Sequence, residues 1–228
     1  MNGGAPDARA NNTAARVVHH RWPSGLCGLA DEVIDIMNRN AAWDLLNEYT
    51  KTPALVRHGQ CVEASMRYYA RKLGADEEQW GVAGLLHDFD YERWPDVPAH
   101  TLEGAKILRE RGCDEEIVGA MLSHVPWNLE GYPRDRPIRK MLFACDELSG
   151  FVYAVALVRP ERIGGMKAKS VIKKLKQKAF AAAVSREDIY AGAELIEIPL
   201  PEHVGNCIEA LREVAAELEI LPPEQEAS

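Results

Sequence analysis

The chain has 228 residues, of which 46% are hydrophobic, with 27 Lys and Arg against 35 Asp and Glu. This composition predicts a soluble globular protein of one domain, because the core material is ample and the charge bias is too small for a disordered chain. The formal charge of −8 argues against a nucleic-acid polymer or a membrane as the partner, since phosphate surfaces are bound by clustered cations.

Helical patterns fill the chain between two irregular ends. Residues 1–28 are rich in Gly, Ala, Asn and Pro without hydrophobic periodicity, so they are predicted to form a mobile leader, and residues 221–228 a similar tail. Between these ends, acidic residues open helical patterns and Gly or Pro closes them. Helices are predicted over 29–38, 44–49, 53–73, 76–88, 101–111, 114–125, 138–158, 167–183 and from after Pro201 to about Leu218.

The fold class follows from the predicted helices and from the absence of strand, repeat and linker patterns in the sequence. No segment shows the alternating pattern of a strand, no repeat occurs at solenoid periods, and no long linker divides the middle of the chain. The sequence therefore predicts an all-α protein with one helical domain over residues 29–220.

The cysteines are scattered singly along the chain, without a CxxC pair. This usage argues against a disulfide framework and against a zinc ribbon, and it fits a reducing cytoplasm. Residues 1–21 also lack the apolar core of a signal peptide, so the predicted location is cytoplasmic. The five positions are Cys27, Cys61, Cys113, Cys145 and Cys207.

Asp146 is the most informative ionisable residue of the central region. Its neighbours at helical spacing, within 142–153, are apolar or small, so its carboxylate lies on the stripe that faces a core. An unpaired carboxylate is costly to bury, so a positive group must compensate it. His124 shares a helical face with apolar residues, and His87 ends an apolar run. Both histidines are therefore also expected to need a polar or charged partner in the core.

Several ionisable side chains that point into one core are what a metal site needs. Imidazole nitrogen and carboxylate oxygen are ligands for borderline and harder divalent cations. One core histidine is usually a hydrogen-bonded structural residue, and one buried aspartate is often a helix cap or an arginine partner. Six such groups would need six separate structural explanations, so the sequence predicts a metal site. Its candidate ligands are His58, His87, Asp88, His100, His124 and Asp146.

The order of these residues resembles the H…HD…D signature of HD-domain phosphohydrolases. The matching residues are His58, then His87–Asp88 in VAGLLHD, then Asp146 in LFACDEL. The resemblance extends over roughly residues 44–158. It implies a compact helical bundle of the HD-domain type.

Two further histidines make the resemblance more specific. His100 in AHTLEGAKIL and His124 in MLSHV fall where the two-metal members of the superfamily place their extra histidines. By this resemblance, the metal-site core spans 44–158 and the C-terminal helices span 160–220. The implied cofactor is one or two divalent transition-metal ions, which could be Fe, Mn, Co, Ni or Zn.

The resemblance also implies how the ligands are shared. Asp88 would bridge the two ions and act as the catalytic residue. The expected reaction is hydrolysis of a small phosphate mono- or diester, nucleotide-like, by a metal-activated hydroxide. The first ion would be held by His58, His87, Asp88 and Asp146, and the second by Asp88, His100 and His124.

Departures from the family pattern leave other functions open. The HDIGK-type sequence of the HD-GYP phosphodiesterases is replaced here by the run His87–Tyr91, which removes the lysine. Gly131–Pro133 is interpreted as a turn, so cleavage of a cyclic dinucleotide is not expected. Two alternatives remain: a mixed-valent di-iron oxygenase with the same ligands, and a metal-binding regulatory module without turnover.

An anionic substrate would need cationic contacts, which the acidic average hides. Arg139 belongs to a basic cluster before the Asp146 helix, and six lysines lie between 167 and 178. Such a lysine-rich helix usually has a solvated face. The sharper hypothesis turns Lys169 and Lys173 toward the metals to bind phosphate. Asp90 is expected either to touch the leaving group or to support a ligand from behind. The sequence predicts no oligomeric state.

Overall fold

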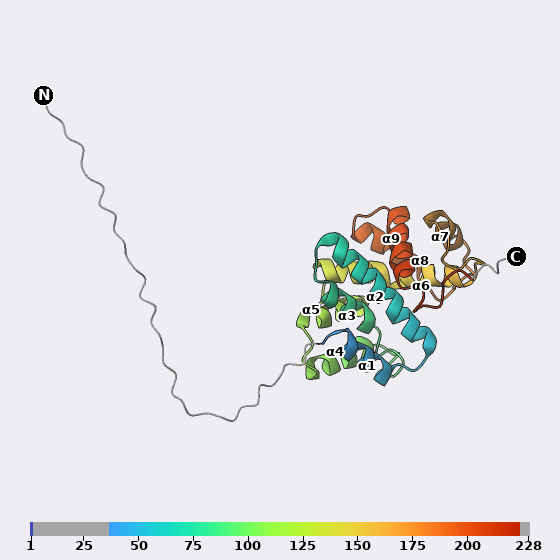
Figure 1. The fold of residues 1–228 in the computed structure, drawn as a ribbon. Helices are drawn as coiled ribbons and strands as arrows, with labels where there is room; N and C mark the ends of the chain where they lie inside the picture. Colours follow the sequence, from blue (N-terminus) through green and yellow to red (C-terminus); the bar gives the residue numbers. More distant parts are fainter. Residues whose placement is uncertain (2–36, 224–228) are drawn as a thin grey trace. The chain divides into compact units, whose positions relative to one another are not determined.

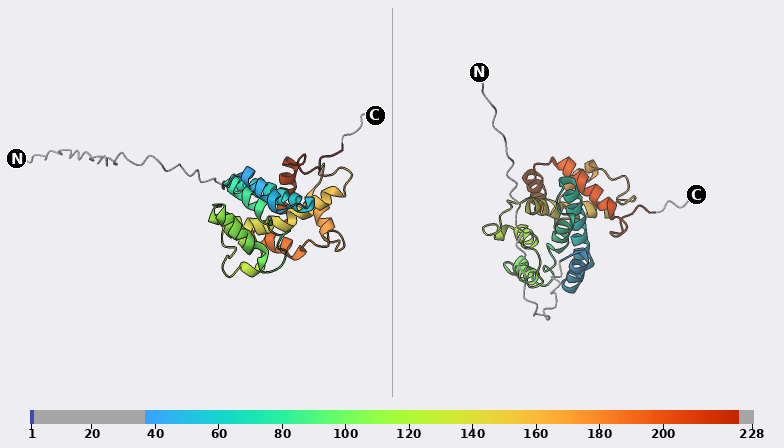
Figure 2. Two further views of the ribbon diagram at one scale, coloured as in Figure 1. Left: turned by 90° about the horizontal axis from the view of Figure 1, so that it is seen from below. Right: turned by 60° about the vertical axis from the view of Figure 1, so that its left-hand side comes forward.

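The computed structural model describes Met1 and residues 37–223, and these residues form nine α-helices, one short 3₁₀-helix and no strand (Figures 1 and 2). The all-α prediction is confirmed. The elements are α1 (Arg39–Tyr49), α2 (Pro53–Leu73), α3 (Glu77–Leu86), α4 (Ala99–Glu110), α5 (Glu115–Ser123), η1 (Pro126–Asn128), α6 (Pro137–Leu157), α7 (Ala168–Leu175), α8 (Arg186–Leu195) and α9 (Leu200–Glu213).

Local capping explains where the N-terminal helices begin. Asp76 caps α3 by accepting the N–H of Gln79 at 3.0 Å. Asn38 caps α1 in the same way, so that helix begins at Arg39, five residues before the predicted 44–49. Of the helix predicted over 29–38, only Met37 and Asn38 are described, and neither is helical. The predicted leader 1–28, apart from Met1, lies outside the described residues.

The lysine-rich helix is shorter than predicted. α7 ends at Leu175, and residues 176–183 form turns instead of continuing the helix to Ala183. Arg186 stabilises these turns and the residues after them, because its guanidinium donates to the carbonyls of Phe180, Ala181 and Val184. Those carbonyls are thereby satisfied without helical partners.

The C-terminal helices differ from the prediction in two further ways. Helix α8 is absent from the prediction, and Ser185 caps it by accepting the N–H of Asp188 at 3.2 Å. α9 ends at Glu213 and not near Leu218, and the chain after it turns through Glu219 at φ 58°. Residues 221–223 have no regular structure, and the rest of the predicted tail lies outside the described residues.

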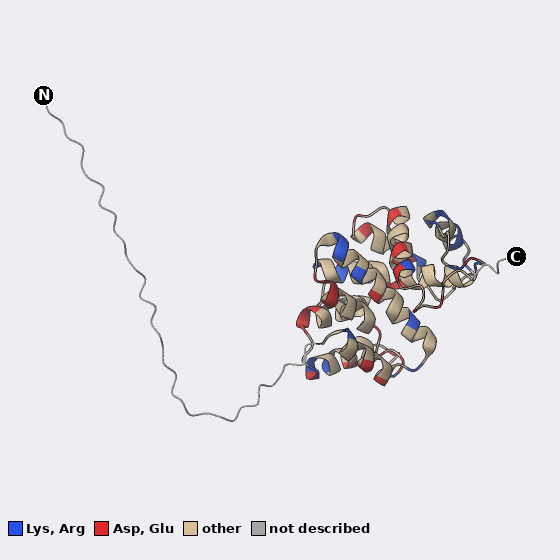
Figure 3. Cartoon of the chain, in the orientation of Figure 1, with Lys and Arg blue, Asp and Glu red and all other residues tan. Residues whose placement is uncertain are grey.

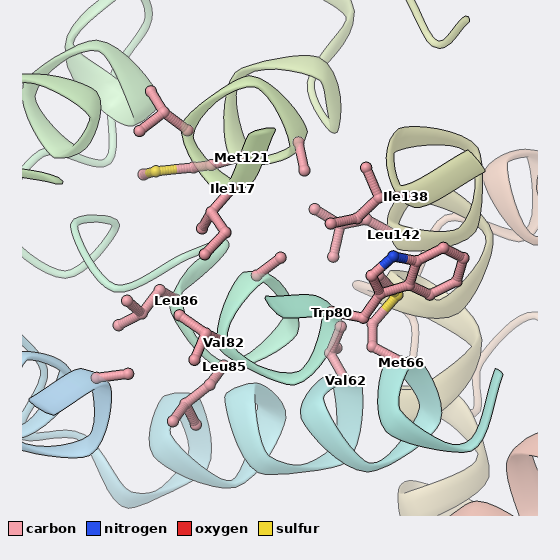
Figure 4. Packing of buried hydrophobic residues seen from close by; sticks show 14 of the residues in the cluster. Val62, Met66, Trp80, Val82, Leu85, Leu86, Ile117, Met121, Ile138 and Leu142 are labelled. Carbon is pink, nitrogen blue, oxygen red and sulfur yellow. The ribbon is translucent and has the colours of Figure 1, made fainter. Parts of the chain in front are cut away.

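Two hydrophobic clusters hold these helices together. The first joins α1, α3, α4 and α5 to α2 and the first half of α6, and Figure 4 shows its centre around Val82 and Leu142. The second joins α7, α8 and α9 to α2 and the second half of α6. Gly84 lets α3 lie close to α2, because a Cβ there would come within 3.0 Å of the Glu63 backbone. No described helix is long and apolar enough for a membrane crossing.

Candidate metal centre

Five helices bring the six predicted ligand side chains together. α3 and α5 end at His87 and His124, which are their C-terminal cap residues, and α4 begins with a distorted turn at His100. His58 lies in the second turn of α2, and Asp146 lies in the middle of α6. Helix ends and one buried helix face therefore converge on the same place.

One half of the cluster surrounds the end of α3. The Nε2 atom of His58 lies 3.1 Å from Nε2 of His87 and 3.0 Å from Oδ1 of Asp146. The Nε2 atom of His87 lies 3.4 Å from the same Asp146 oxygen. Three candidate ligand atoms thus face one another at distances that a shared cation would fit.

Asp88 connects this half to the second one. Its Oδ1 lies 3.3 Å from Nε2 of His100 and 3.1 Å from Nε2 of His124. Its Oδ2 lies 3.5 Å from Nε2 of His87 and 3.9 Å from Nε2 of His58. The two carboxylate oxygens therefore face different histidine pairs. Each pair forms with Asp88 a group whose ligand atoms lie within 4.8 Å of one another.

Hydrogen bonds behind the histidines determine which nitrogen faces the cluster. Nδ1 of His87 lies 2.8 Å from the Gly84 carbonyl, and Nδ1 of His124 lies 2.6 Å from the Met121 carbonyl. A carbonyl can only accept, so Nδ1 carries a proton, and in the neutral imidazole that a metal ion needs Nε2 presents a lone pair. In that neutral form the buried Oδ1 of Asp88 has no hydrogen-bond donor. Lone pairs that face one another fit a divalent cation.

Asp90 supports His100 from behind, and this corrects its prediction as a substrate contact. Its side chain is 0% exposed, and its Oδ1 accepts the Nδ1–H of His100 at 3.1 Å. Its Oδ2 accepts the backbone N–H groups of Thr101 at 2.8 Å and Gly104 at 3.0 Å. These bonds hold Thr101 at φ 69°, a conformation that costs energy for a β-branched residue. Asp90 therefore orients a candidate ligand and does not reach the pocket.

All of the cluster residues except His87 line a pocket of about 300 Å³. No Lys or Arg is among the described residues that line it. Beyond the cluster, its wall carries three aromatic and two acidic side chains: Tyr91, Trp127, Phe143, Glu147 and Asp188.

The cations predicted to bind the substrate lie elsewhere. Lys169 and Lys173 are exposed on α7, because Val171 and Leu175 form the buried side of that helix. Figure 3 shows the basic positions of α7 in blue. Arg139 donates to the Pro133 carbonyl at 3.1 Å. None of the three lines the pocket at the cluster. The structure therefore gives them no contact with a ligand there.

The acidic side chains of the wall were missed at the level of sequence. Glu147 directly follows Asp146, and nothing in the pattern separates it from an ordinary helical glutamate. Asp188 had a usable signal, because Ser185 followed three residues later by an acidic residue is typical of a helix N-terminus. That signal predicts α8, which carries Asp188 to the pocket.

The carboxylates and imidazoles of the cluster shift one another's pKa values. Burial opposes the charged imidazoles, but Asp88 and Asp146 raise the pKa of His87 to about 9, and Asp88 and Asp90 raise that of His100 to about 9. The histidines hold the pKa values of Asp88 and Asp146 far below the usual range, against the effect of burial. Burial and then the Asp146 charge raise the pKa of Glu147 to about 7.

Comparison with known families agrees with this geometry. Residues 58–149 match the model of the HD domain, a range that contains all six residues of the cluster. This part of the chain is therefore similar to the HD domain.

Similar individual proteins cover different parts of the chain. A tRNA (cytidine(56)-2'-O)-methyltransferase of Thermoplasma volcanium is 29% identical over 90 residues. That match covers 40% of this chain and 26% of the relative, so the chain spans about a quarter of that protein's length.

Two solved structures are also similar, and both are the HD domain of the L. monocytogenes phosphodiesterase PgpH. The first has a TM-score of 0.45 at 15% identity and covers 76% of this chain and 98% of that one. The second, in complex with cyclic-di-AMP, has a TM-score of 0.41 at 15% identity and covers 76% and 97%.

Proposed function

We propose that this protein is a metal-dependent phosphohydrolase that cleaves a small phosphate mono- or diester, with nucleotide-like esters as the first candidates. The observation that carries the proposal is the position of Asp88, whose two oxygens face two different histidine pairs. The match of residues 58–149 to the HD domain supports the same reaction class. The predicted cytoplasmic location and the absence of a nucleic-acid polymer as partner stay predictions.

The six side chains would divide between one or two divalent ions. When bound, such ions would lower the pKa of water to supply a nucleophile and would offset the charge of the phosphoryl oxygens. His58, His87 and Asp146 would hold one ion, and His100 and His124 the other. Asp88 would contact both, and this is the catalytic role we assign to it. The candidate ions are Fe, Mn, Co, Ni and Zn.

The pocket supports direct hydrolysis by water. No Ser or Cys is among the described residues that line it, so these residues offer no serine or cysteine nucleophile for a covalent intermediate. The chain's own contribution is positioning. The carbonyls of Gly84 and Met121 and the carboxylate of Asp90 fix the orientation of three histidine rings.

The test is metal analysis of protein purified without added metal, followed by a panel of nucleotides and sugar phosphates with each metal restored. We expect hydrolysis of at least one phosphoester and its loss by more than about 100-fold in Asp88→Asn. Asp96→Asn, an exposed residue outside the pocket, is the matched control.

Three outcomes of this test distinguish the alternatives. Unchanged hydrolysis in Asp88→Asn would contradict the proposed role of the bridging carboxylate. Bound iron with a mixed-valent EPR signal and no phosphatase activity would favour the di-iron oxygenase. Bound metal without turnover of any ester would favour a regulatory module.

A further inference from the structure

The pocket wall beyond the cluster is acidic, although the proposed substrate is an anion. Glu147 and Asp188 are both half-buried at this wall. Neither forms an ion pair with a Lys, Arg or His side chain of the described residues. A phosphate group bound at the cluster would therefore lie near two carboxylates without an ion-pair partner, although Asp188 is attracted by Arg134 and Glu147 by His58 at longer range. This arrangement is unfavourable unless a bound molecule supplies a positive charge.

Asp188 is held at the wall by specific packing of α8. Gly192 allows the close approach of α8 to α6, because a Cβ there would lie 2.7 Å from the Cα of Ala144. The Ser185 hydroxyl accepts the Asp188 N–H and fixes the first turn of the helix. The positive end of the helix dipole favours an ionised carboxylate at this position. Asp188 is thus a placed negative charge at the pocket wall.

Charge balance points to the missing partner. With two divalent ions, the charges of Asp88, Asp146 and a metal-activated hydroxide leave a surplus of one positive charge, which is less than the two negative charges of a phosphate monoester dianion. Glu147 and Asp188 are not included in that balance. A substrate with a positive nitrogen in its alcohol part would neutralise them within the same pocket.

The aromatic side chains suit the same group. The rings of Tyr91 and Trp127 lie with their centroids 5.2 Å and 6.0 Å from that of His100. Phe143 also lines the pocket, but the guanidinium carbon of Arg134 already lies 3.5 Å from the centroid of its ring. Aromatic faces attract organic cations, and methylated ammonium groups in particular are bound by aromatic walls. A hydrated metal ion would gain nothing comparable from these rings.

We infer that the pocket binds a phosphate ester whose alcohol part carries an ammonium group, and that Glu147 and Asp188 recognise this group. The inference rests on the proposed phosphohydrolase function and names its substrate class. Glu147 and Asp188 are specificity-determining residues in this account. The metal cluster binds the phosphate, and the acidic and aromatic wall binds the positive nitrogen.

The test compares esters of matched shape. Phosphocholine is paired with 3,3-dimethylbutyl phosphate, in which carbon replaces the charged nitrogen, and O-phosphoethanolamine with propyl phosphate. We expect kcat/KM of the metal-loaded protein to be at least about tenfold higher for the charged member of a pair. Calorimetric binding of the same esters gives a readout that does not depend on turnover.

Two variants test the assigned residues against a close control. Asp188→Asn and Glu147→Gln keep the shape of each side chain and remove its charge, so each is expected to reduce the preference about tenfold, through KM. Glu187→Gln is the control, because Glu187 is exposed next to Asp188 and does not line the pocket. It should leave the preference unchanged. Thermal unfolding of each variant verifies that it is folded.

The outcomes separate this inference from the proposed function. Hydrolysis of the neutral esters as fast as the charged ones, or an undiminished preference in Asp188→Asn, would overturn the ammonium site and leave the phosphohydrolase standing. Stimulation of neutral esters by extra Mg²⁺, lost in Asp188→Asn, would show that the wall binds a metal ion instead, which also overturns it. If no ester is hydrolysed, the proposed function fails. Tighter binding of the charged esters would then still support the ammonium site, and equal binding would overturn it.

Discussion

The substitution Asp90→Asn tests whether this buried carboxylate positions a metal ligand or contacts a substrate. Asp90 accepts three hydrogen bonds, from the Nδ1–H of His100 and from the backbone N–H groups of Thr101 and Gly104. An asparagine side chain has the same shape but only one accepting oxygen. Its amide NH₂ must therefore face either the imidazole N–H or the two backbone N–H groups, and all of these are donors.

The size of the effect follows from those contacts. A hydrogen bond to a charged acceptor contributes about 1.5–3 kcal/mol, and a buried donor left without a partner costs about 1–3 kcal/mol. The free energy of unfolding should therefore fall by about 3 kcal/mol, since at least one such bond is lost. Loss of the group that orients a histidine ligand typically costs about 10–100-fold in metal affinity. We expect a loss in that range, at the ion held by His100 and His124.

Urea unfolding in a chelator measures the first effect, and titration with Mn²⁺ measures the second. Asp96→Asn, in the same loop but exposed, is the control. A variant with normal stability and normal Mn²⁺ affinity but a raised KM would refute the positioning role, because that pattern is what a substrate contact produces.

Three other predictions follow from the packing and charge of the cluster. Gly150→Ala would place a Cβ 3.2 Å from Nδ1 of His58, so the Mn²⁺ affinity should fall several-fold. The free energy of unfolding in urea should change by less than about 1 kcal/mol. An unchanged Mn²⁺ affinity would contradict the close contact between position 150 and His58. Gly192→Ala would force α8 away from α6 and should lower the melting temperature, at a cost of about 1–3 kcal/mol, whereas a more stable variant would disprove the contact. In the folded chain without metal, the pKa values of His87 and His100 are raised to about 9. Their protonation therefore stabilises the folded state fully below the unfolded pKa of about 6.5, and this stabilisation is lost as the pH rises through 9. Metal binding needs neutral imidazoles, so the Mn²⁺ affinity measured by calorimetry should rise over the same pH interval. The expected rise is up to about tenfold per pH unit for each proton released. An affinity that does not change with pH would exclude this proton release.

The identity of the candidate ligands was predictable from the sequence, but how their side chains come together in space was only partly predictable. His87 and Asp88 follow an apolar helix, and Asp146 lies on an apolar stripe, so a local pattern already places these side chains toward a core. The division of the two Asp88 oxygens between two histidine pairs depends on how α2, α4 and α5 pack around it, and no local pattern contains that information.

The role of Asp90 shows the same limit. From the sequence it is one more acidic residue after the HD pair, and both expected roles are reasonable. Its actual partners are the backbone N–H groups of Thr101 and Gly104, which point at it only because the start of α4 is distorted. The absence of Lys169 and Lys173 from the pocket is likewise a matter of helix placement, because charge alone does not show which way α7 faces.

Helix α8 is a different case, because its signal was present and was overlooked. Ser185 and the acidic residues after it form an N-terminal pattern, but the preceding lysine-rich segment continued the helical pattern too far. The error mattered for function, since α8 supplies Asp188 to the pocket wall.

The most direct test of the central claim is a crystal structure of the Mn²⁺-soaked protein with anomalous scattering data. The account predicts two anomalous peaks in the pocket, one against Nε2 of His58 and His87 and one against Nε2 of His100 and His124. One oxygen of Asp88 should contact each peak. A single peak away from Asp88, or peaks only on surface carboxylates, would contradict it.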